Sequence, residues 1–140
     1  NIPLKDFVEG IKPLYPQIEW HIHIPEDATW SADKNMLHQV FINLTKNAIE
    51  AHASAIDIRC FHKHQESIES SQFSGIYFSN NGAPIPADVA KEMFIPFFST
   101  KPLGSGIGLS ISRQMLMMQS INLSLAEHNV AGYHVTFRME

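Results

Sequence analysis

The chain has 140 residues, of which 44% are hydrophobic, and this is the size of one ordinary domain with one core. Its formal net charge is -4 and it carries no basic stripe, which argues against nucleic acid as a partner. The single cysteine excludes a disulfide framework within the chain and fits a reducing compartment.

The sequence pattern contains no secretory signal and no membrane helix, because no apolar run comes near the ~20 residues that such a helix needs. The chain begins at Asn1 without a methionine, so we expect residues 1–140 to be a single domain taken from a larger protein. We expect the domain to be cytoplasmic, and the pattern leaves open whether the parent is anchored in the inner membrane.

The first third of the chain predicts a helix, a strand and a long helix. Residues 4–14 read as a short helix stopped by prolines, and residues 18–24 alternate apolar and polar side chains as a half-buried strand does. A turn at 25–29 follows. The long helix begins at Ser31 or Asp33 as its cap and repeats apolar residues at helical spacing: Met36, Val40, Leu44, Ala48 and Ala51.

The remaining elements are mostly short. Residues 55–61 predict a strand with Ile56, Ile58 and Cys60 on one face, so we expect the thiol to be buried. A polar hairpin loop at 63–73, a strand at 75–79, helices at 86–93 and 107–119, and a closing hairpin of 121–127 with 133–139 follow. This order predicts an α+β fold, a two-layer α/β sandwich whose mixed, mostly antiparallel sheet packs on about three helices.

Two segments about fifty residues apart carry the chemistry. Residues 38–52 form an amphipathic helix with Asn43 and Asn47 one turn apart, and residues 94–114 contain a glycine-rich loop that leads into a helix. Glycines at a helix start let backbone N–H groups approach phosphates, and the helix dipole favours the anion. A carboxamide on a facing helix supplies a neutral oxygen to a phosphate-bound magnesium. The two segments therefore predict a nucleotide site.

Four motifs occur in the order that one known family has. They are NLTKNAIEA at 43–51, SNNGAPIP at 79–86, MFIPFFSTK at 93–101 and GSGIGLS at 104–110. They resemble the N box, the first glycine box, the F box and the second glycine box of the catalytic, ATP-binding domain of bacterial sensor histidine kinases, in the GHKL superfamily. The resemblance covers nearly the whole chain and implies the Bergerat ATP-binding fold.

The resemblance also implies the chemistry. ATP and Mg²⁺ are the expected cofactors, and the γ-phosphate goes to a histidine on a separate dimerisation domain, with a response regulator downstream. Asn43 and Asn47 are the expected catalytic residues, and Asn47 is the expected Mg²⁺ ligand. The expected ATP contacts are Asn43, Lys46, Asn47, Asn80, Gly82, Ile85, Phe94, Phe98, Thr100, Lys101, Gly104, Ser105, Gly106, Ile107, Gly108 and Leu109.

Asn43 bears on the type of reaction. Related GHKL ATPases, such as gyrase and the mismatch-repair ATPases, have a glutamate at this position that activates water. An amide does not accept a proton at neutral pH, so Asn43 is no general base. This favours a kinase that keeps its γ-phosphate for a protein acceptor, and Asn43 is then expected to bind phosphate or a metal-bound water.

The first glycine box departs from the family pattern at two positions. Asn80 replaces the aspartate that accepts the adenine amino proton, and Pro84 replaces the second glycine. An amide still offers an acceptor oxygen, but it lacks the charge that strengthens the bond, and it also offers donors to a guanine carbonyl. We expect weaker ATP binding than in aspartate-bearing relatives and poorer discrimination against GTP. Pro84 stiffens the turn.

Other readings remain open at this point. Phe94, Phe97 and Phe98 serve either core packing or a hinge for an ATP lid over about 98–105, and Lys46 and His38 either contact phosphate or lie on a solvated face. The histidine pairs at 21/23 and 62/64 lack further ligands, so we expect no metal other than magnesium. The alternative functions are a GHKL serine kinase of the anti-sigma type and an interaction module that transfers no phosphate.

Overall fold

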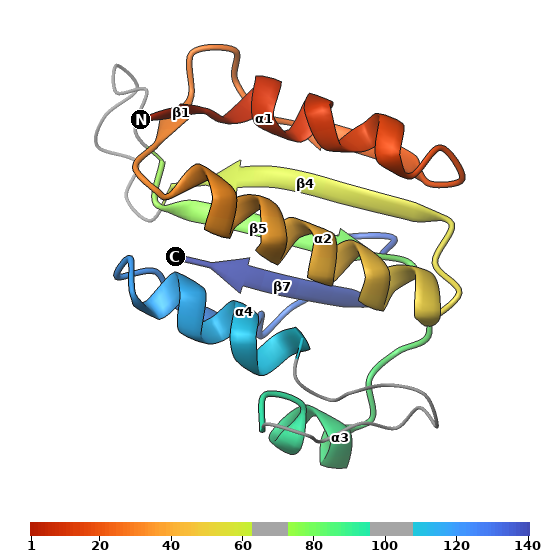
Figure 1. The fold of residues 1–140 in the computed structure, drawn as a ribbon. Helices are drawn as coiled ribbons and strands as arrows, with labels where there is room; N and C mark the ends of the chain where they lie inside the picture. The colour runs from red at the N-terminus through yellow and green to blue at the C-terminus, as the bar shows by residue number, and fades with distance from the viewer. Residues whose placement is uncertain (63–72, 96–107) are drawn as a thin grey trace.

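A computed structural model describes residues 1–62, 73–95 and 108–140 of the chain. Within these ranges, three helices lie on one face of a five-stranded sheet (Figure 1). They are α1 (Leu4–Ile11), α2 (Lys34–Glu50) and α4 (Gly108–Met117). The expected two-layer α+β sandwich is confirmed.

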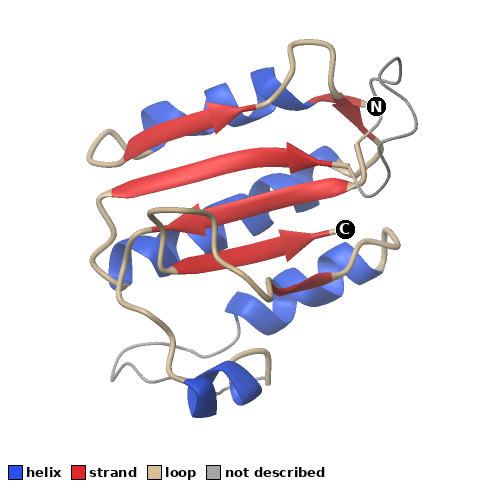
Figure 2. Cartoon of the chain, turned by 180° about the vertical axis from the view of Figure 1, so that it is seen from behind, coloured by secondary structure: helices blue, strands red, loops and turns tan. Residues whose placement is uncertain are grey.

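The sheet has the strand order β2-β4-β5-β7-β6. Only β2 and β4 run parallel, and the other neighbouring pairs are antiparallel, so the sheet is mixed and mostly antiparallel as predicted. Seen from behind, the sheet has no described helix in front of it (Figure 2). The strands are β2 (Glu19–His23), β4 (Ala55–Phe61), β5 (Gly75–Asn80), β6 (Leu123–Leu125) and β7 (Val135–Met139).

Several short elements complete the described chain. A 3₁₀ turn, η1 (Lys12–Leu14), extends α1, and α3 (Ala87–Glu92) lies apart from the sheet (Figure 1). The expected turn at 25–29 is wrong at its end, because Thr29 begins a two-residue strand, β3 (Thr29–Trp30), that pairs with β1 (Ile2–Pro3). The hairpin loop expected at 63–73 lies almost wholly outside the described residues. Among the described helices, none is long and apolar enough to cross a membrane.

Helix α2 begins at a side-chain cap and buries a broad face. Asp33 is the N-cap, and its Oδ1 accepts a hydrogen bond from the backbone N–H of Met36 at 2.9 Å, which satisfies one donor of the first turn. The buried positions of α2 include Leu37 and Phe41 beside the predicted stripe. The stripe is wider than predicted because α2 contacts both the sheet and its neighbouring helices.

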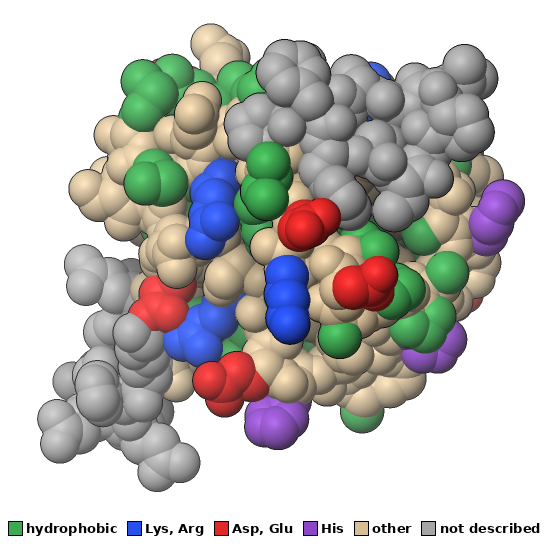
Figure 3. All heavy atoms as spheres, turned by 90° about the horizontal axis from the view of Figure 1, so that it is seen from below, with side chains coloured by type: hydrophobic (Ala, Val, Ile, Leu, Met, Phe, Trp, Pro, Cys, Tyr) green, Lys and Arg blue, Asp and Glu red, His purple; other side chains and the backbone are tan. Residues whose placement is uncertain are grey.

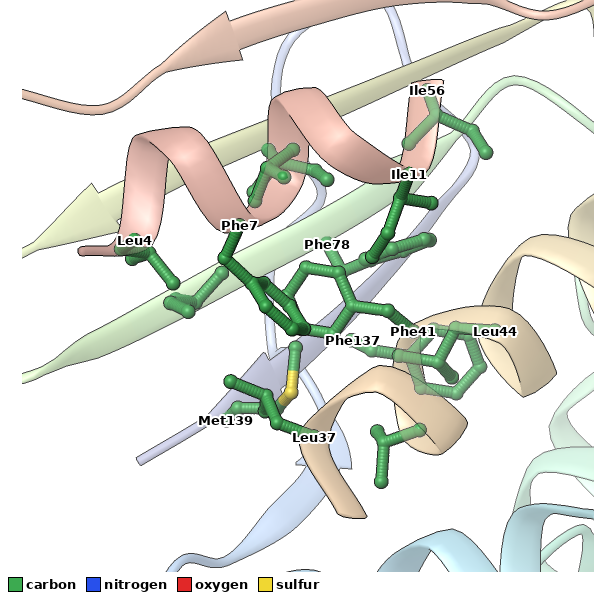
Figure 4. Packing of buried hydrophobic residues seen from close by; sticks show 14 of the residues in the cluster. Leu4, Phe7, Ile11, Leu37, Phe41, Leu44, Ile56, Phe78, Phe137 and Met139 are labelled. Atoms are coloured by element: carbon green, nitrogen blue, oxygen red, sulfur yellow. The ribbon is translucent and has the colours of Figure 1, made fainter. Parts of the chain in front are cut away.

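The core lies between the helices and the sheet, and Phe41 is at its centre. The Phe41 ring meets Phe7 of α1 at 5.3 Å and Phe78 of β5 at 5.5 Å between centroids, both edge to face. Figure 4 shows Leu4, Phe7 and Ile11 pointing from α1 toward the same space that the α2 side chains enter. This packing fixes the position of α2 over the strands, and α2 carries the site.

Candidate functional site

One face of α2 runs the length of the candidate site. Asn43, Asn47 and Ala51 follow one another at intervals of four residues, so they share a face. At a rise of 1.5 Å per residue, they span about 12 Å. Asn43 contacts the start of α4, and Ala51 contacts the turn after β5. Asn47 therefore lies between the two segments that the sequence assigned to phosphate and base.

Asn43 is held by protein partners at both ends of its amide. Its Oδ1 accepts from Gln39 Nε2 at 3.1 Å, and its Nδ2 donates to Ser112 Oγ at 3.0 Å and to the Gly108 carbonyl at 3.4 Å. Ser112 is fully buried in α4. In this structure Asn43 therefore ties α2 to α4, a role that the sequence did not predict.

The amide of Asn47 differs from that of Asn43 in its hydrogen bonds. Its Nδ2 is buried and has no hydrogen-bond partner among the described residues. A buried unsatisfied amide is unfavourable, and natural structures contain few of them. Because the two ends of an amide have nearly the same shape, a half-turn exchanges Nδ2 and Oδ1 within the same space. Asn47 is thus able to present its oxygen to a ligand, which fits the requirement of Mg²⁺ for an oxygen donor.

Asn80 is the last residue of β5, and it is 3% exposed. It follows Ile76 and Phe78 at intervals of two, so it points to the helix side of the sheet. Its Oδ1 accepts a hydrogen bond from the backbone N–H of Gly82 at 2.9 Å. A Cβ added to Gly82 would lie 2.8 Å from the Ala51 carbonyl oxygen, so only glycine fits against the end of α2 here.

The turn after Asn80 is held from two further sides. The backbone N–H of Ala83 donates to the Ala51 carbonyl at 2.9 Å. The backbone N–H of His134 donates to the Asn80 carbonyl at 3.1 Å, and His134 Nδ1 lies 3.0 Å from the Gly82 carbonyl. A carbonyl only accepts, so Nδ1 carries the proton in this contact. The sequence did not single out His134, because it lies 52 residues from Gly82 and no local pattern marks such a contact.

The remaining expected contacts divide into three groups. Lys46 is exposed on α2, and no atom of the described residues lies within 4 Å of a Cβ built at Gly108, the first residue of α4. Ile85, Phe94 and Leu109 are half-buried against the core. Phe98, Thr100, Lys101, Gly104, Ser105, Gly106 and Ile107 lie outside the described residues.

Phe94 has a specific partner in α4. The Arg113 guanidinium lies 4.6 Å from the centroid of the Phe94 ring, a cation–π distance. The contact joins the first residue expected in the hinge to the helix that follows the glycine box. Figure 3 views the molecule from below, and basic and acidic side chains are interspersed on that face, so no single-sign field dominates what is visible there.

Two of the described residues with shifted pKa values, Arg59 and Cys60, lie on β4. On β4, Asp57 is 2% exposed and is bound by Arg59 through two bonds of 2.7 Å and by His23 Nε2 at 3.1 Å. The hydrogen bond to Asp57 raises the pKa of Arg59. Burial raises the pKa of Cys60 to about 12, so this thiol is protonated at neutral pH. We assign Asp57, Arg59, His23 and Cys60 to stability, because they lie on β2 and β4 and the contact of His23 with Asp57 joins those two strands.

Residues 32–140 match the family described as "Histidine kinase-, DNA gyrase B-, and HSP90-like ATPase". The chain is 31% identical over 113 residues to the signal transduction histidine-protein kinase AtoS of Escherichia coli (strain K12), which covers 78% of this chain and 17% of AtoS. It is 33% identical to the sensor protein VanS of Enterococcus faecium, over 95% of this chain and 35% of VanS. The chain therefore spans only a minor part of these relatives.

The fold, like the sequence, is similar to that of histidine kinase catalytic domains. The catalytic domain of histidine kinase ThkA, in a nucleotide-free form, superposes with a TM-score of 0.75 and 27% identity over 99% of this chain and 91% of that chain. The ATP-binding domain of PrrB from Mycobacterium tuberculosis superposes with a TM-score of 0.69 at 16% identity, over 96% of this chain and 87% of that chain, a likeness of fold alone.

Proposed function

The chain belongs to the family of histidine kinase-, DNA gyrase B- and HSP90-like ATPases, and on that premise we propose that it is the nucleotide-binding catalytic domain of a two-component sensor histidine kinase. In the parent protein it transfers the γ-phosphate of a Mg²⁺-bound nucleoside triphosphate to a histidine on a dimerisation domain. That phosphate then passes to a response regulator. The names of the relatives favour a histidine acceptor over the serine of an anti-sigma kinase.

The state of Asn47 is the observation that carries the proposal. Its amide lies on α2 between the partners of Asn43 and the turn at Gly82, and its buried Nδ2 has no partner among the described residues. A side chain in this state is unfavourable in the free protein, and no described partner fixes which end of its amide faces a ligand. When bound, magnesium supplies charge neutralisation on the triphosphate, and Asn47 is the residue that would hold it through its oxygen.

The other residues position the nucleotide, and Asn43 does not activate water for hydrolysis. Asn80 and the turn held by His134 receive the base, and the N-terminal end of α4 at Gly108 binds phosphate, where no atom of the described residues crowds an added Cβ. Asn43 has no proton-accepting group at neutral pH, and its oxygen accepts from Gln39. Hydrolysis therefore lacks a general base at this position, and transfer depends on in-line positioning against the histidine of the partner domain.

The proposal is tested by calorimetric titration of the chain with ATP and GTP, with and without Mg²⁺. We expect binding that Mg²⁺ strengthens, and we expect Asn47→Ala to weaken the Mg²⁺-dependent affinity at least about tenfold, or about 1.4 kcal/mol. Asn35→Ala is the matched control, because Asn35 is an exposed asparagine in the first turn of the same helix. Failure of both nucleotides to bind at millimolar concentration would favour the interaction module and remove the kinase proposal.

A further inference from the structure

The turn that follows β5 contains a residue that is intrinsically free to rotate. Gly82 lies so close to α2 that an added Cβ would meet the Ala51 carbonyl oxygen at 2.8 Å, so glycine is needed there. Glycine also has the widest choice of backbone conformations of any residue. The close approach to α2 therefore places the most flexible residue in this turn, and its orientation has to be fixed by contacts from outside.

The peptide unit between Gly82 and Ala83 is held at both of its polar ends. Its N–H, which belongs to Ala83, donates to the Ala51 carbonyl at 2.9 Å. Its carbonyl, which belongs to Gly82, lies 3.0 Å from His134 Nδ1. The first contact comes from the end of α2 and the second from the residue before β7. Loss of the His134 contact leaves only one end of this peptide restrained.

His134 is itself held on both sides of its backbone. Its N–H donates to the Asn80 carbonyl at 3.1 Å, and its own carbonyl accepts from Asn129 Nδ2 at 2.9 Å. The Val130 carbonyl accepts from the backbone N–H of Tyr133 at 3.0 Å, which closes a tight turn just before His134. His134 is exposed, so its position depends on these bonds more than on packing.

We propose that His134 is a positioning residue for the base of the bound nucleotide, and that Asn129 supports it from the loop before β7. The inference rests on the proposed nucleotide site and adds two residues that act on it through Gly82. Asn129 holds His134, and His134 holds the Gly82 carbonyl. The Gly82 N–H in turn donates to Asn80 Oδ1 at 2.9 Å. His134 therefore fixes the turn that orients Asn80, without touching the base itself.

The contact with Gly82 requires a hydrogen-bond donor at the place of Nδ1. A carbonyl only accepts, and Nδ1 donates to it both in the neutral ring that carries its proton there and in the protonated ring. In asparagine the amide nitrogen is bonded to Cγ, as Nδ1 is in histidine, so His134→Asn keeps a donor at this place. Leucine has the same branched shape as asparagine and no donor. His134→Leu and His134→Asn therefore differ in the hydrogen bond and little in size.

The proposal is tested by calorimetric titration of each variant with ATP in Mg²⁺, well below its melting temperature. We expect His134→Leu to weaken ATP binding about threefold to tenfold and His134→Asn to stay within about twofold of the original chain, since one neutral hydrogen bond is lost only in the first. We expect Asn129→Ala to cause a smaller loss, because the His134 N–H keeps its bond to Asn80.

His128→Leu is the matched control, because His128 is an exposed histidine in the same loop between β6 and β7. We expect it to bind ATP as the original chain does. The melting temperature of each variant shows that it is folded, so a change in affinity reports the site and not the folded fraction.

The outcomes separate the two proposals. If the original chain binds ATP and His134→Leu binds it as tightly, the positioning role is overturned and the kinase proposal stands. Equal losses in His134→Leu and His134→Asn, or in His134→Leu and His128→Leu, overturn it as well, because the donor at this place is then irrelevant. An unchanged affinity in Asn129→Ala removes Asn129 from the proposal. If the original chain fails to bind ATP at millimolar concentration, both proposals fall together.

Discussion

At the scale of single residues, the site contains three asparagines whose amides differ in their partners. Asn43 uses both ends of its amide within the protein, Asn80 is oriented by Gly82, and Asn47 has a buried Nδ2 without a partner among the described residues. A buried unsatisfied donor costs about 1–3 kcal/mol. The side chain that carries this penalty is the one that the family resemblance assigns to the metal.

Cys60 affects stability through its ionisation, and its effect belongs to alkaline pH. Its pKa is raised by burial from 9.0 to about 12, so folding favours the protonated thiol. The stability that follows is complete below about pH 9 and is lost as the pH rises toward 12. We expect the free energy of unfolding in urea to fall less between about pH 9 and 11 for the Cys60→Val variant than for the original chain.

Tyr133 requires a control in this measurement. Burial also raises its pKa, so Tyr133 contributes an alkaline decline in stability of the same sign, and the Tyr133→Phe variant removes that contribution.

Cys60 is the only cysteine in the chain, so one thiol reagent reports on one site. We expect slow reaction at about pH 8 in the folded chain and rapid reaction in urea. Equal rates in the two states would show that Cys60 is accessible and its pKa ordinary.

At the scale of elements, the two ends of α4 are attached to α2. Near its start, Ser112 accepts from Asn43, and beyond its last residue Gln119 accepts from the backbone N–H of Asp33 and lies 3.7 Å from Met36 Sδ. The other end of α2 is attached to the turn at Gly82, because the Ala51 carbonyl accepts a hydrogen bond from Ala83 N–H. Helix α2 therefore sets the distance between the turn at Gly82 and the first turn of α4.

We expect the turn at Gly82 and helix α1 to respond to an added methyl group in opposite ways. Gly82→Ala places a Cβ against the Ala51 carbonyl, so we expect it to lower the free energy of unfolding by about 1–3 kcal/mol and to weaken nucleotide binding. Gly10 lies in α1 with no described atom within 4 Å of an added Cβ. Gly10→Ala is expected to raise the free energy of unfolding by up to about 1 kcal/mol, since alanine favours the helix.

Denaturation in urea with matched slopes measures both glycine variants. The two substitutions make the same chemical change, so the sign of each effect reports the surroundings alone. A Gly82→Ala variant as stable as the original chain would mean that the turn shifts away from α2.

At the scale of the whole molecule, one ring joins both layers. Phe41 of α2 is fully buried and contacts Phe7 of α1 and Phe78 of β5 (Figure 4). The opposite face of the sheet has a stack of its own, in which Phe61 and Tyr77 lie 4.4 Å apart, but both rings are only half-buried. The main hydrophobic core therefore lies between the helices and the sheet.

The two aromatic positions give a graded prediction. Phe41→Ala is expected to lower the free energy of unfolding by about 3–5 kcal/mol, because it opens a cavity where three elements meet. That is a large share of the roughly 5–15 kcal/mol of a typical domain. Phe61→Ala removes a half-exposed ring, so its effect should be clearly smaller. Chemical denaturation measures both, and equal effects would contradict the assignment of the core to the helix side.

The fold was predictable to the extent that its signals are local. The alternation at 18–24 and 55–61 and the helical spacing of Val40, Leu44 and Ala48 gave the order of elements, and four motifs in order gave the family. Thr29 was misplaced, because its strand exists only through pairing with β1. Leu37 and Phe41 were missed as core residues because burial from two sides at once widens the stripe beyond one helical row.

The sequence by itself determined the α+β class, the family and the presence of asparagines where phosphate, metal and base are expected, since propensity, periodicity and motif order are properties of neighbouring residues. The tertiary structure alone decided what each amide offers. Asn43 meets Ser112 from 69 residues away, and His134 reaches across 52 residues to hold the turn at Gly82. An amide has a donor end and an acceptor end, and only the partners that folding brings to it determine which end faces the ligand.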